Sequence, residues 1–326
     1  AAGYKSFSDD IMSPEEFNHL SENVIPVVVD ARPFGQYSMV DIDAKGGMQV
    51  IVKELLDAGL LNGDTLTCTG ETLAEQIKRL DPPKPDGDVI YSVAKPYKET
   101  GGLRVLGGNL SPEFSAVLKL AGVEGGLENN LFHGKAKIFN GEQELLDALD
   151  KSSESFDNFD MIVVRYEGPF GAPGMPEMLD STSRITALCR ERNIVVGLMT
   201  DGRFSGGSVG LVIGHVGPEA AAGGAIALIE ENDTIIVDLN TNELNCEQLL
   251  DSAVYAERKA KWDRDVADNN GTHPSVGVAD TRLLNRMRCS AVSAVFGAGM
   301  HPDRSLWVRE PREPVKSKFE PSNKFK

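Results

Sequence analysis

The chain of 326 residues carries 33 basic and 49 acidic side chains, which gives a formal net charge of −16. An acidic balance of this size argues against nucleic-acid binding and against attraction to anionic membrane surfaces, because both need a basic face. Apolar residues make up 41% of the chain, which excludes disorder over its whole length, and the length favours two domains.

The first hundred residues predict alternating strand and helix. The β-branched run at 24–30 predicts a buried strand. Apolar residues at helical spacing predict a helix over 48–58 that ends before Gly59. Three prolines within 81–87 exclude both a helix and a central strand, so this segment is predicted to be a linker. We expect a domain boundary within 81–102.

The rest of the chain predicts an α/β domain with a compact, barrel-like sheet. Continuous apolar runs predict buried strands, and the periodic patterns between and after them predict helices. The strands are expected at 161–165, 194–199, 225–229 and 234–237, and the helices at 142–150, 183–192 and 248–262. The last stretch, 303–326, is rich in proline and basic residues and predicts an extended or disordered tail.

The cysteines and the apolar runs bear on the compartment. No two cysteines have the C-x-x-C spacing, which indicates free thiols and shows no local zinc or iron–sulfur ligand set. These cysteines are Cys68, Cys189, Cys246 and Cys289. No apolar run reaches membrane-spanning length, and residues 1–5 lack the apolar core of a signal peptide. We therefore expect a cytosolic or organelle-matrix protein with no membrane or nucleic-acid partner.

Three glycine-dense segments contain the residues most able to carry chemistry. They lie at 107–113, 165–178 and 200–208, and the last two directly follow predicted buried strands. Loops at strand ends are where α/β proteins place their sites. We therefore take these three segments as candidate binding or catalytic loops.

Glu177 and Ser205 are the candidates in the two strand-end loops. The carboxylate of Glu177 lies in a loop constrained by glycine and proline, and a hard cation such as Mg²⁺ prefers oxygen ligands of this kind. The alternative is that Glu177 only stabilises the N-terminus of the following helix. Ser205 lies between Arg203 and two glycines, which together can bind a carboxylate or phosphate. The alternative for Ser205 is a capped tight turn.

Other patterns give weaker indications. The segment 206–210 matches G-x-S-x-G, but glycines precede the serine instead of a strand, and His215 follows too soon for a hydrolase triad. His215 is either a core histidine or a supporting group near a site. The five histidines lack metal-ligand spacing, and no nucleotide-binding glycine motif occurs.

At the three candidate loops the sequence resembles the dihydroxy-acid dehydratase and 6-phosphogluconate dehydratase family. The matching segments occur in the family's order across roughly residues 24–240. They are 59–70, 108–113, 165–169, 174–175, 200–207, 214–216 and 218–220. For the fold, the resemblance implies the end of an α/β N-terminal domain over 1–100 and a β-barrel-like swivelling β/β/α domain over 101–265. Residues 266–326 are expected to be an extension and tail without a family counterpart.

For the chemistry, the resemblance implies a hydro-lyase that removes water from a 2,3-dihydroxy acid to give a 2-keto acid. A [2Fe–2S] or [4Fe–4S] cluster acts on the C3 hydroxyl, and Mg²⁺ holds the carboxylate and the C2 hydroxyl. Ser205 matches the serine base, and Glu177 matches a metal-binding glutamate. The resemblance further implies substrate contacts from Asn109, Arg203, Gly206 and Gly207, and supporting roles for Glu167, Asp201 and His215.

Departures from the family pattern leave alternatives open. The family's cluster cysteines and its other metal ligands lie in a half that precedes residue 1, so this chain alone is expected to bind no cluster and to be inactive. Phe114, Phe170 and Ala172 change the loop sequences. The motif at 202–207 favours the branched-chain type of substrate, and a sugar-acid dehydratase is the alternative. A non-catalytic module that lost the cluster half is a further alternative, and a homo-oligomer is expected.

Overall fold

The computed structural model describes residues 12–32, 35–120, 127–151, 156–172, 175–204, 210–277 and 281–300. The chain divides into two compact units, the first ending at Gly102 and the second beginning at Leu103. This division lies at the end of the 81–102 range in which a boundary is expected from the sequence.

The described part of the first unit is helical and contains no regular strand. The predicted helix over 48–58 is confirmed, whereas the predicted strand at 24–30 is wrong. That segment forms only isolated bridges, from Val27 to Lys98 and from Val29 to Ile90, and Pro26 offers no N–H for a continuous ladder. The helical elements are α1 (Pro14–His19), the π-helix η1 (Leu20–Val24), α2 (Met39–Ala44), α3 (Met48–Asp57) and α4 (Leu73–Leu80).

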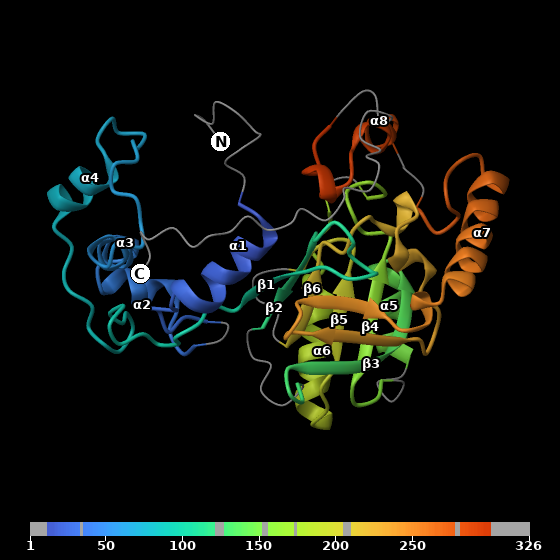
Figure 1. The fold of residues 1–326 in the computed structure, drawn as a ribbon, viewed down its shortest axis with the longest axis horizontal. Coiled ribbons are helices and arrows are strands. Elements are labelled where there is room, and N and C mark those ends of the chain that lie inside the picture. The colour runs from blue at the N-terminus through green and yellow to red at the C-terminus, as the bar shows by residue number, and fades with distance from the viewer. Residues whose placement is uncertain are drawn as a thin grey trace. The chain divides into compact units, whose positions relative to one another are not determined.

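The second unit is built on one eight-stranded mixed sheet (Figure 1). Its strand order is β1-β2-β6-β5-β4-β3-β7-β8. The four central strands, β6, β5, β4 and β3, run parallel to one another, and every other pairing in the sheet is antiparallel. The strands are β1 (Leu103–Leu106), β2 (Ala116–Lys119), β3 (Leu131–Asn140), β4 (Asp160–Arg165), β5 (Gly197–Thr200), β6 (Leu211–Gly214), β7 (Thr234–Asp238) and β8 (Glu243–Cys246).

The sheet curves into a nearly closed barrel, because its two edge strands meet. Gly107, at the end of β1, forms a bridge with Glu243 at the start of β8. The Gly107 amide donates to the Asn242 carbonyl at 2.9 Å, and the Leu244 amide donates to the Gly107 carbonyl at 2.9 Å. These bonds satisfy edge groups that an open sheet would leave exposed. The expected α/β fold with a barrel-like sheet is confirmed.

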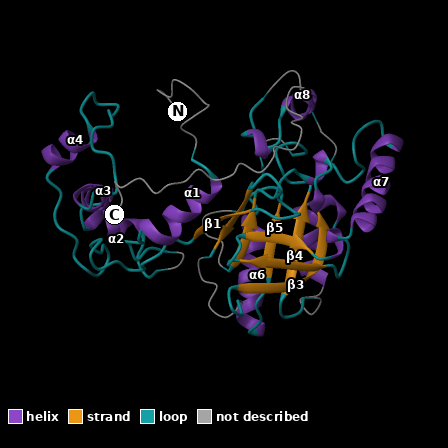
Figure 2. Cartoon of the chain, viewed as in Figure 1, coloured by secondary structure: helices purple, strands orange, loops and turns teal. Residues whose placement is uncertain are grey.

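Two apolar clusters lie on opposite faces of this sheet. Along β4, Met161 and Val163 belong to the barrel interior, whereas Ile162 and Val164 pack with residues of α5 (Glu142–Lys151) and α6 (Leu179–Arg192). Alternate residues of a strand face opposite sides, so a strand buried on both faces reads as a continuous apolar run. Figure 2 shows the helices around the strands.

The remaining predictions for the second unit are partly confirmed. Strands at 161–165 and 234–237 and helices at 142–150 and 183–192 are confirmed, while β5 begins later than 194. The expected strand at 225–229 is wrong, because this segment forms the short 3₁₀ helix η4 (Ala225–Leu228).

The C-terminal part of the second unit is mainly helical. The predicted helix at 248–262 is confirmed from Ser252 onward and extends further than expected. The elements here are η5 (Gln248–Leu250), α7 (Ser252–Asp268), α8 (Arg282–Ser290) and η6 (Ala294–Phe296), and η3 (Ala220–Ala222) follows β6. The predicted tail, 303–326, lies outside the described residues.

Candidate functional site

Three loops meet at one edge of the barrel because they follow parallel neighbouring strands. Tyr166 and Glu167 follow β4, Asp201 to Arg203 follow β5, and His215 follows β6. The carboxyl ends of parallel strands lie at the same edge of a sheet, where α/β proteins bind ligands. The fold therefore brings together the second and third glycine-dense segments of the sequence.

Asp201 joins these loops through its buried carboxylate. Its Oδ1 accepts a hydrogen bond from the Glu167 amide at 3.0 Å, and its Oδ2 accepts from the amides of Tyr166 at 3.0 Å and Ala220 at 2.9 Å. Burial raises the pKa of Asp201 to about 6, although the three amide bonds oppose that shift. Asp201 therefore fixes segments that come from three parts of the chain, and its part in a functional site stays a prediction.

Two glycines allow these loops to approach closely. A Cβ on Gly168 would lie 2.4 Å from Cγ of Glu219 and 2.8 Å from the Asp201 carbonyl oxygen. A Cβ on Gly202 would lie 2.8 Å from the Glu167 carbonyl oxygen. Real Cβ atoms do not reach such distances, so both positions need glycine. This packing explains why the strand-end loops are glycine-dense.

Glu167 binds the N-terminus of α5. Its Oε1 accepts a hydrogen bond from the Glu142 amide at 2.8 Å. Burial raises the pKa of Glu167, and the nearby charge of Glu142 raises it further. The Glu167 carboxylate is thus bound to the backbone of α5, and its supporting role in a site stays a prediction.

Glu177 and Arg203 lie next to each other. The two residues form an isolated bridge, and Nη2 of Arg203 lies 3.7 Å from Oε1 of Glu177. Nε of Arg203 donates to the Met175 carbonyl at 3.3 Å. The Glu177 side chain is 53% exposed, so its carboxylate remains accessible. The structure thus brings the predicted metal-binding residue next to a predicted substrate-binding residue.

Of the remaining predicted residues in these loops, the structure describes His215 but not Ser205, Gly206 or Gly207. Ser205, Gly206 and Gly207 lie outside the described residues. The His215 amide donates to the Gly202 carbonyl at 2.9 Å. Burial lowers the pKa of the half-buried His215 ring, and Arg203 lowers it further against the opposing charge of Glu219. The lowered pKa favours the neutral form of the His215 imidazole.

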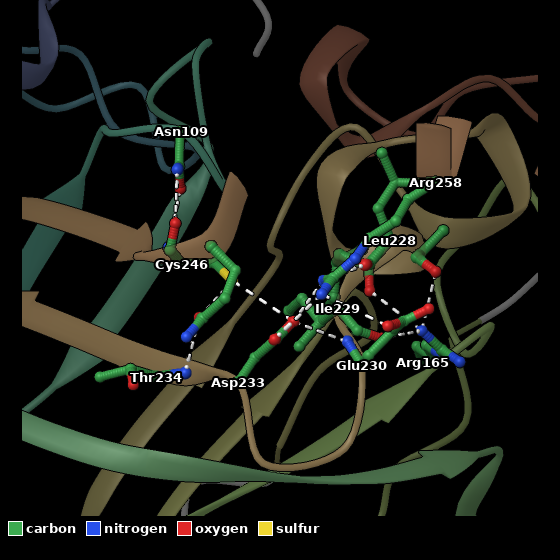
Figure 3. Close-up of polar contacts among 12 residues, drawn as sticks. Asn109, Arg165, Leu228, Ile229, Glu230, Asp233, Thr234, Cys246 and Arg258 are labelled. Atoms are coloured by element: carbon green, nitrogen blue, oxygen red, sulfur yellow. Dashed lines mark hydrogen bonds and ion pairs between the residues drawn. The ribbon is translucent and has the colours of Figure 1, made fainter. Parts of the chain in front are cut away.

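Asn109 is bound to the edge strand β8 (Figure 3). Its Nδ2 donates to the Cys246 carbonyl at 2.8 Å, and its Oδ1 accepts from the Cys246 amide at 2.8 Å. Its own amide donates to Oδ1 of Asn245 at 2.7 Å. These bonds give Asn109 a role in closing the barrel, and its contact with substrate stays a prediction.

Two polar residues near the loops, the partly buried Arg165 and the buried Glu219, were not given individual roles from the sequence. Arg165 donates to Oδ1 of Asn140 at 2.7 Å and to the carbonyls of Ala227 at 2.8 Å and Ile229 at 3.0 Å, which anchors η4 and the residue that follows it (Figure 3). Oε1 of Glu219 accepts from the Ala294 amide at 2.7 Å, while its Oε2 is buried without a partner in the described part of the chain. Both residues lie in segments that carry the family resemblance, 165–169 and 218–220, but neither segment shows which contacts these side chains make.

An aromatic stack covers the β4 loop. The His273 ring lies between Tyr166, at a centroid distance of 5.0 Å, and Trp262 of α7, at 5.8 Å, with interplanar angles of 15° and 9°. The Lys259 ammonium lies 4.7 Å from the Trp262 ring centroid. Tyr166 has a φ of 70°, a left-handed conformation that is costly for a bulky residue. The stack and the bonds to Asp201 hold this conformation.

The described residues do not contain a complete metal centre. Among them, no three His, Cys, Asp or Glu side chains are grouped to hold an ion. Glu177 fits as one oxygen ligand of a hard cation. Of the four free cysteines, Cys68 and Cys289 are exposed and Cys246 is buried, and none gathers into an iron–sulfur ligand set. No helix in the described ranges is long and apolar enough to cross a bilayer.

Two family models match this chain. The dihydroxy-acid/6-phosphogluconate dehydratase C-terminal model matches residues 88–298, and the N-terminal model of the same family matches residues 8–76. The C-terminal match continues past residue 265. The expectation that residues after 265 have no family counterpart is therefore wrong as far as residue 298.

Curated relatives give the same result. A dihydroxy-acid dehydratase from Arthrobacter sp. (strain FB24) is 44% identical over 249 residues, which cover 76% of this chain and 41% of that protein. One from Mycobacterium sp. (strain JLS) is 43% identical over 284 residues, covering 87% of this chain and 45% of that protein. The chain spans less than half the length of these relatives. With the family model matching most of its length, the chain belongs to the dihydroxy-acid/6-phosphogluconate dehydratase family.

Proposed function

We propose that this chain is the C-terminal part of a hydro-lyase that converts a 2,3-dihydroxy acid into a 2-keto acid, of the branched-chain amino-acid biosynthetic type. The observation that carries the proposal is the contact between Glu177 and Arg203 at the edge where three strand-end loops meet. Arg203 lies two residues before Ser205 in the sequence. The relatives named dihydroxy-acid dehydratase support this type over a sugar-acid dehydratase.

Each residue has a distinct part in the proposed reaction. Ser205, as its alkoxide, takes the proton from C2, and the electron pair of that C–H bond forms the C2=C3 double bond. The C3 hydroxyl group leaves and gains a proton to become water. The resulting enol loses the proton of its C2 hydroxyl and gains a proton at C3, which gives the 2-keto acid. Arg203 holds the substrate carboxylate by charge-assisted hydrogen bonds, and Asn109, Gly206 and Gly207 provide further substrate contacts.

The supporting residues shape this site. Asp201 and Glu167 fix the loops, and His215 lies near Arg203, whose charge lowers its pKa. Glu177 would supply one oxygen ligand to Mg²⁺. When bound, Mg²⁺ would hold the substrate carboxylate and C2 hydroxyl and favour the serine alkoxide.

We further propose that an iron–sulfur cluster, [2Fe–2S] or [4Fe–4S], belongs to the complete enzyme, with its ligands outside this chain. The separation of the four cysteines supports this proposal. It predicts that this chain alone stays colourless after anaerobic reconstitution with iron and sulfide. The free thiols also favour a cytosol or an organelle matrix. The family resemblance implies a homo-oligomer, which light scattering after size-exclusion chromatography tests.

The base role of Ser205 is tested in a complete enzyme that contains this segment. Ser205→Ala should lower kcat by about 10²–10⁴-fold with little change in KM, because a general base acts in the transition state. Exchange of the substrate C2 proton with solvent should be lost as well, while the melting temperature is retained. Ser208→Ala, three residues later in the sequence, is the matched control. A lowered melting temperature with near-parental turnover would instead indicate a turn cap.

The metal role of Glu177 has its own measurement. Glu177→Gln should weaken Mg²⁺ binding in calorimetry, because the amide keeps the shape but loses the charge that a hard cation needs. Glu191→Gln, on the exposed face of the following helix, is the control. Equal Mg²⁺ affinity in Glu177→Gln and the parent would remove Glu177 from the metal site. Parental activity in both the Ser205 and the Glu177 variants would favour the non-catalytic alternative.

A further inference from the structure

Helix α6, which directly follows Glu177, begins without a side-chain cap of its own. Its N-cap residue is Met178, whose thioether side chain makes no capping hydrogen bond. The first amides of a helix have no intrahelical acceptor, and a helix that begins at a buried position needs one from elsewhere. Leu179 and Asp180 are exposed, but Ser181 is fully buried, so its amide needs an acceptor within the protein.

Glu142, the first residue of α5, supplies an acceptor from another helix. Its Oε1 accepts a hydrogen bond from Oγ of Ser181 at 2.7 Å and lies 3.4 Å from the Ser181 amide nitrogen. Ser181 is in the first turn of α6 and is fully buried. An anionic acceptor at this place also interacts favourably with the helix dipole.

The backbone of Glu142 belongs to a continuous series of hydrogen bonds. Its amide donates to the carboxylate of Glu167 at 2.8 Å, and the Glu167 amide donates to the carboxylate of Asp201 at 3.0 Å. The series runs from Asp201 through Glu167 and Glu142 to Ser181. It links the loops after β4 and β5 to the start of α6.

We infer that Glu142 is a positioning residue that fixes the start of α6 and, through it, the Glu177 carboxylate relative to the β4 and β5 loops. The inference rests on the proposed role of Glu177 in metal binding. The Met178 carbonyl accepts from Oγ1 of Thr182 at 2.9 Å and from Oγ of Ser181 at 3.2 Å, so the residue after Glu177 is bonded to the first turn of α6. Without Glu142, the first turn of α6 loses its external acceptor, and Glu177 loses its fixed place beside Arg203.

The contact itself is tested on this chain by hydrogen exchange of the 178–182 segment. Glu142→Ala should speed exchange there by about five-fold, the size expected for the loss of one helix cap. Glu142→Gln should restore most of the protection, because its amide oxygen still accepts from Ser181. Gln143→Ala, an exposed neighbour on α5, is the matched control. Unchanged exchange in Glu142→Ala would overturn the inference.

The functional consequence is tested in a complete enzyme by Mg²⁺ calorimetry, with the melting temperature measured in parallel. Glu142→Ala should weaken Mg²⁺ binding by about ten-fold, the lower end for residues that orient a metal ligand, and Glu142→Gln should recover it. If Glu177→Gln weakens Mg²⁺ binding but Glu142→Ala does not, the positioning role fails and the proposed function stands. If Glu177→Gln leaves the affinity unchanged, the metal role fails and this inference fails with it.

Discussion

The two units of this chain bury their apolar residues in different ways. The interior cluster of the second unit takes side chains from all eight strands, so segments far apart in the sequence depend on one another. The apolar cluster of the first unit is formed by six buried residues around α2 and α3, while Val40 and Leu66 stay 77% and 70% exposed. We therefore expect substitutions to cost more stability in the second unit.

The largest difference in stability cost between the two units is expected when an ion pair is broken in each. Arg258 of α7 contacts the buried carboxylate of Asp233, with Nη2 to Oδ1 at 3.1 Å (Figure 3). Arg258→Ala would leave that carboxylate buried and unpaired, which typically costs about 3–5 kcal/mol. In the first unit, the exposed pair of Lys53 and Asp57 is the control, and Lys53→Ala should leave stability unchanged within error. Urea denaturation of the chain measures both, and equal effects would contradict the contrast.

A second contrast concerns leucine truncation. Leu118 of β2 is fully buried in the barrel interior, so Leu118→Ala should reduce the free energy of unfolding by about 2–5 kcal/mol. Leu66→Ala in the first unit removes an exposed side chain and should change it by less than about 0.5 kcal/mol. The same denaturation measurement applies. A loss at Leu66 as large as that at Leu118 would mean that Leu66 packs against something when the protein is in solution.

The third contrast is the sign of the pH dependence at two aspartates. The pKa of Asp201 is raised to about 6, so its contribution to stability is fully present below pH 3.8 and is lost as the pH rises through 6. The loss amounts to about 3 kcal/mol. At Asp86 in the first unit, burial is outweighed by backbone amides and Lys45, and the pKa is lowered to about 2. Its contribution is present above pH 3.8 and is lost as the pH falls through 2.

Unfolding followed from pH 2 to 7 checks these two signs. Asp201→Asn should remove the decline between pH 4 and 6, and Asp86→Asn should remove the loss at the acid end. Since the two aspartates lie in different units, hydrogen exchange resolved by peptide separates their contributions. A stability that increases from pH 4 to 6 in the second unit would contradict the assignment for Asp201.

The sequence predicted structural elements whose formation depends on the residues of a single segment, and it failed where pairing with a distant segment decides the structure. The run at 161–165 is apolar on both faces, which indicates a strand buried between a barrel interior and helices, and β4 is that strand. The β-branched run at 24–30 has the same pattern, but it forms only isolated bridges. The pattern of one segment does not show whether another segment will pair with it along its length. An apolar run also does not separate a buried strand from a buried 3₁₀ helix, which is why 225–229 was misassigned.

The candidate site was predictable only in part for a similar reason. Glu177 and Arg203 are recognisable from their loops and from the family resemblance, and the structure brings them together. The role of Asp201 depends on amides from the β4 loop and from the segment after β6, which no local pattern reveals. The contacts of Asn109 with Cys246 and of Glu142 with Ser181 are equally non-local.

The stack of Tyr166, His273 and Trp262 places a tryptophan where its fluorescence can report on the β4 loop. Indole emission is sensitive to an imidazole in contact with it, and it is quenched further when that imidazole becomes charged. The chain has two tryptophans, Trp262 and Trp307, so a Trp307→Phe variant would carry a single emitter. Because His273 also contacts Tyr166, the residue before Glu167, movement of that loop would change the emission of Trp262. Substrate or metal binding could then be followed in real time without an attached dye.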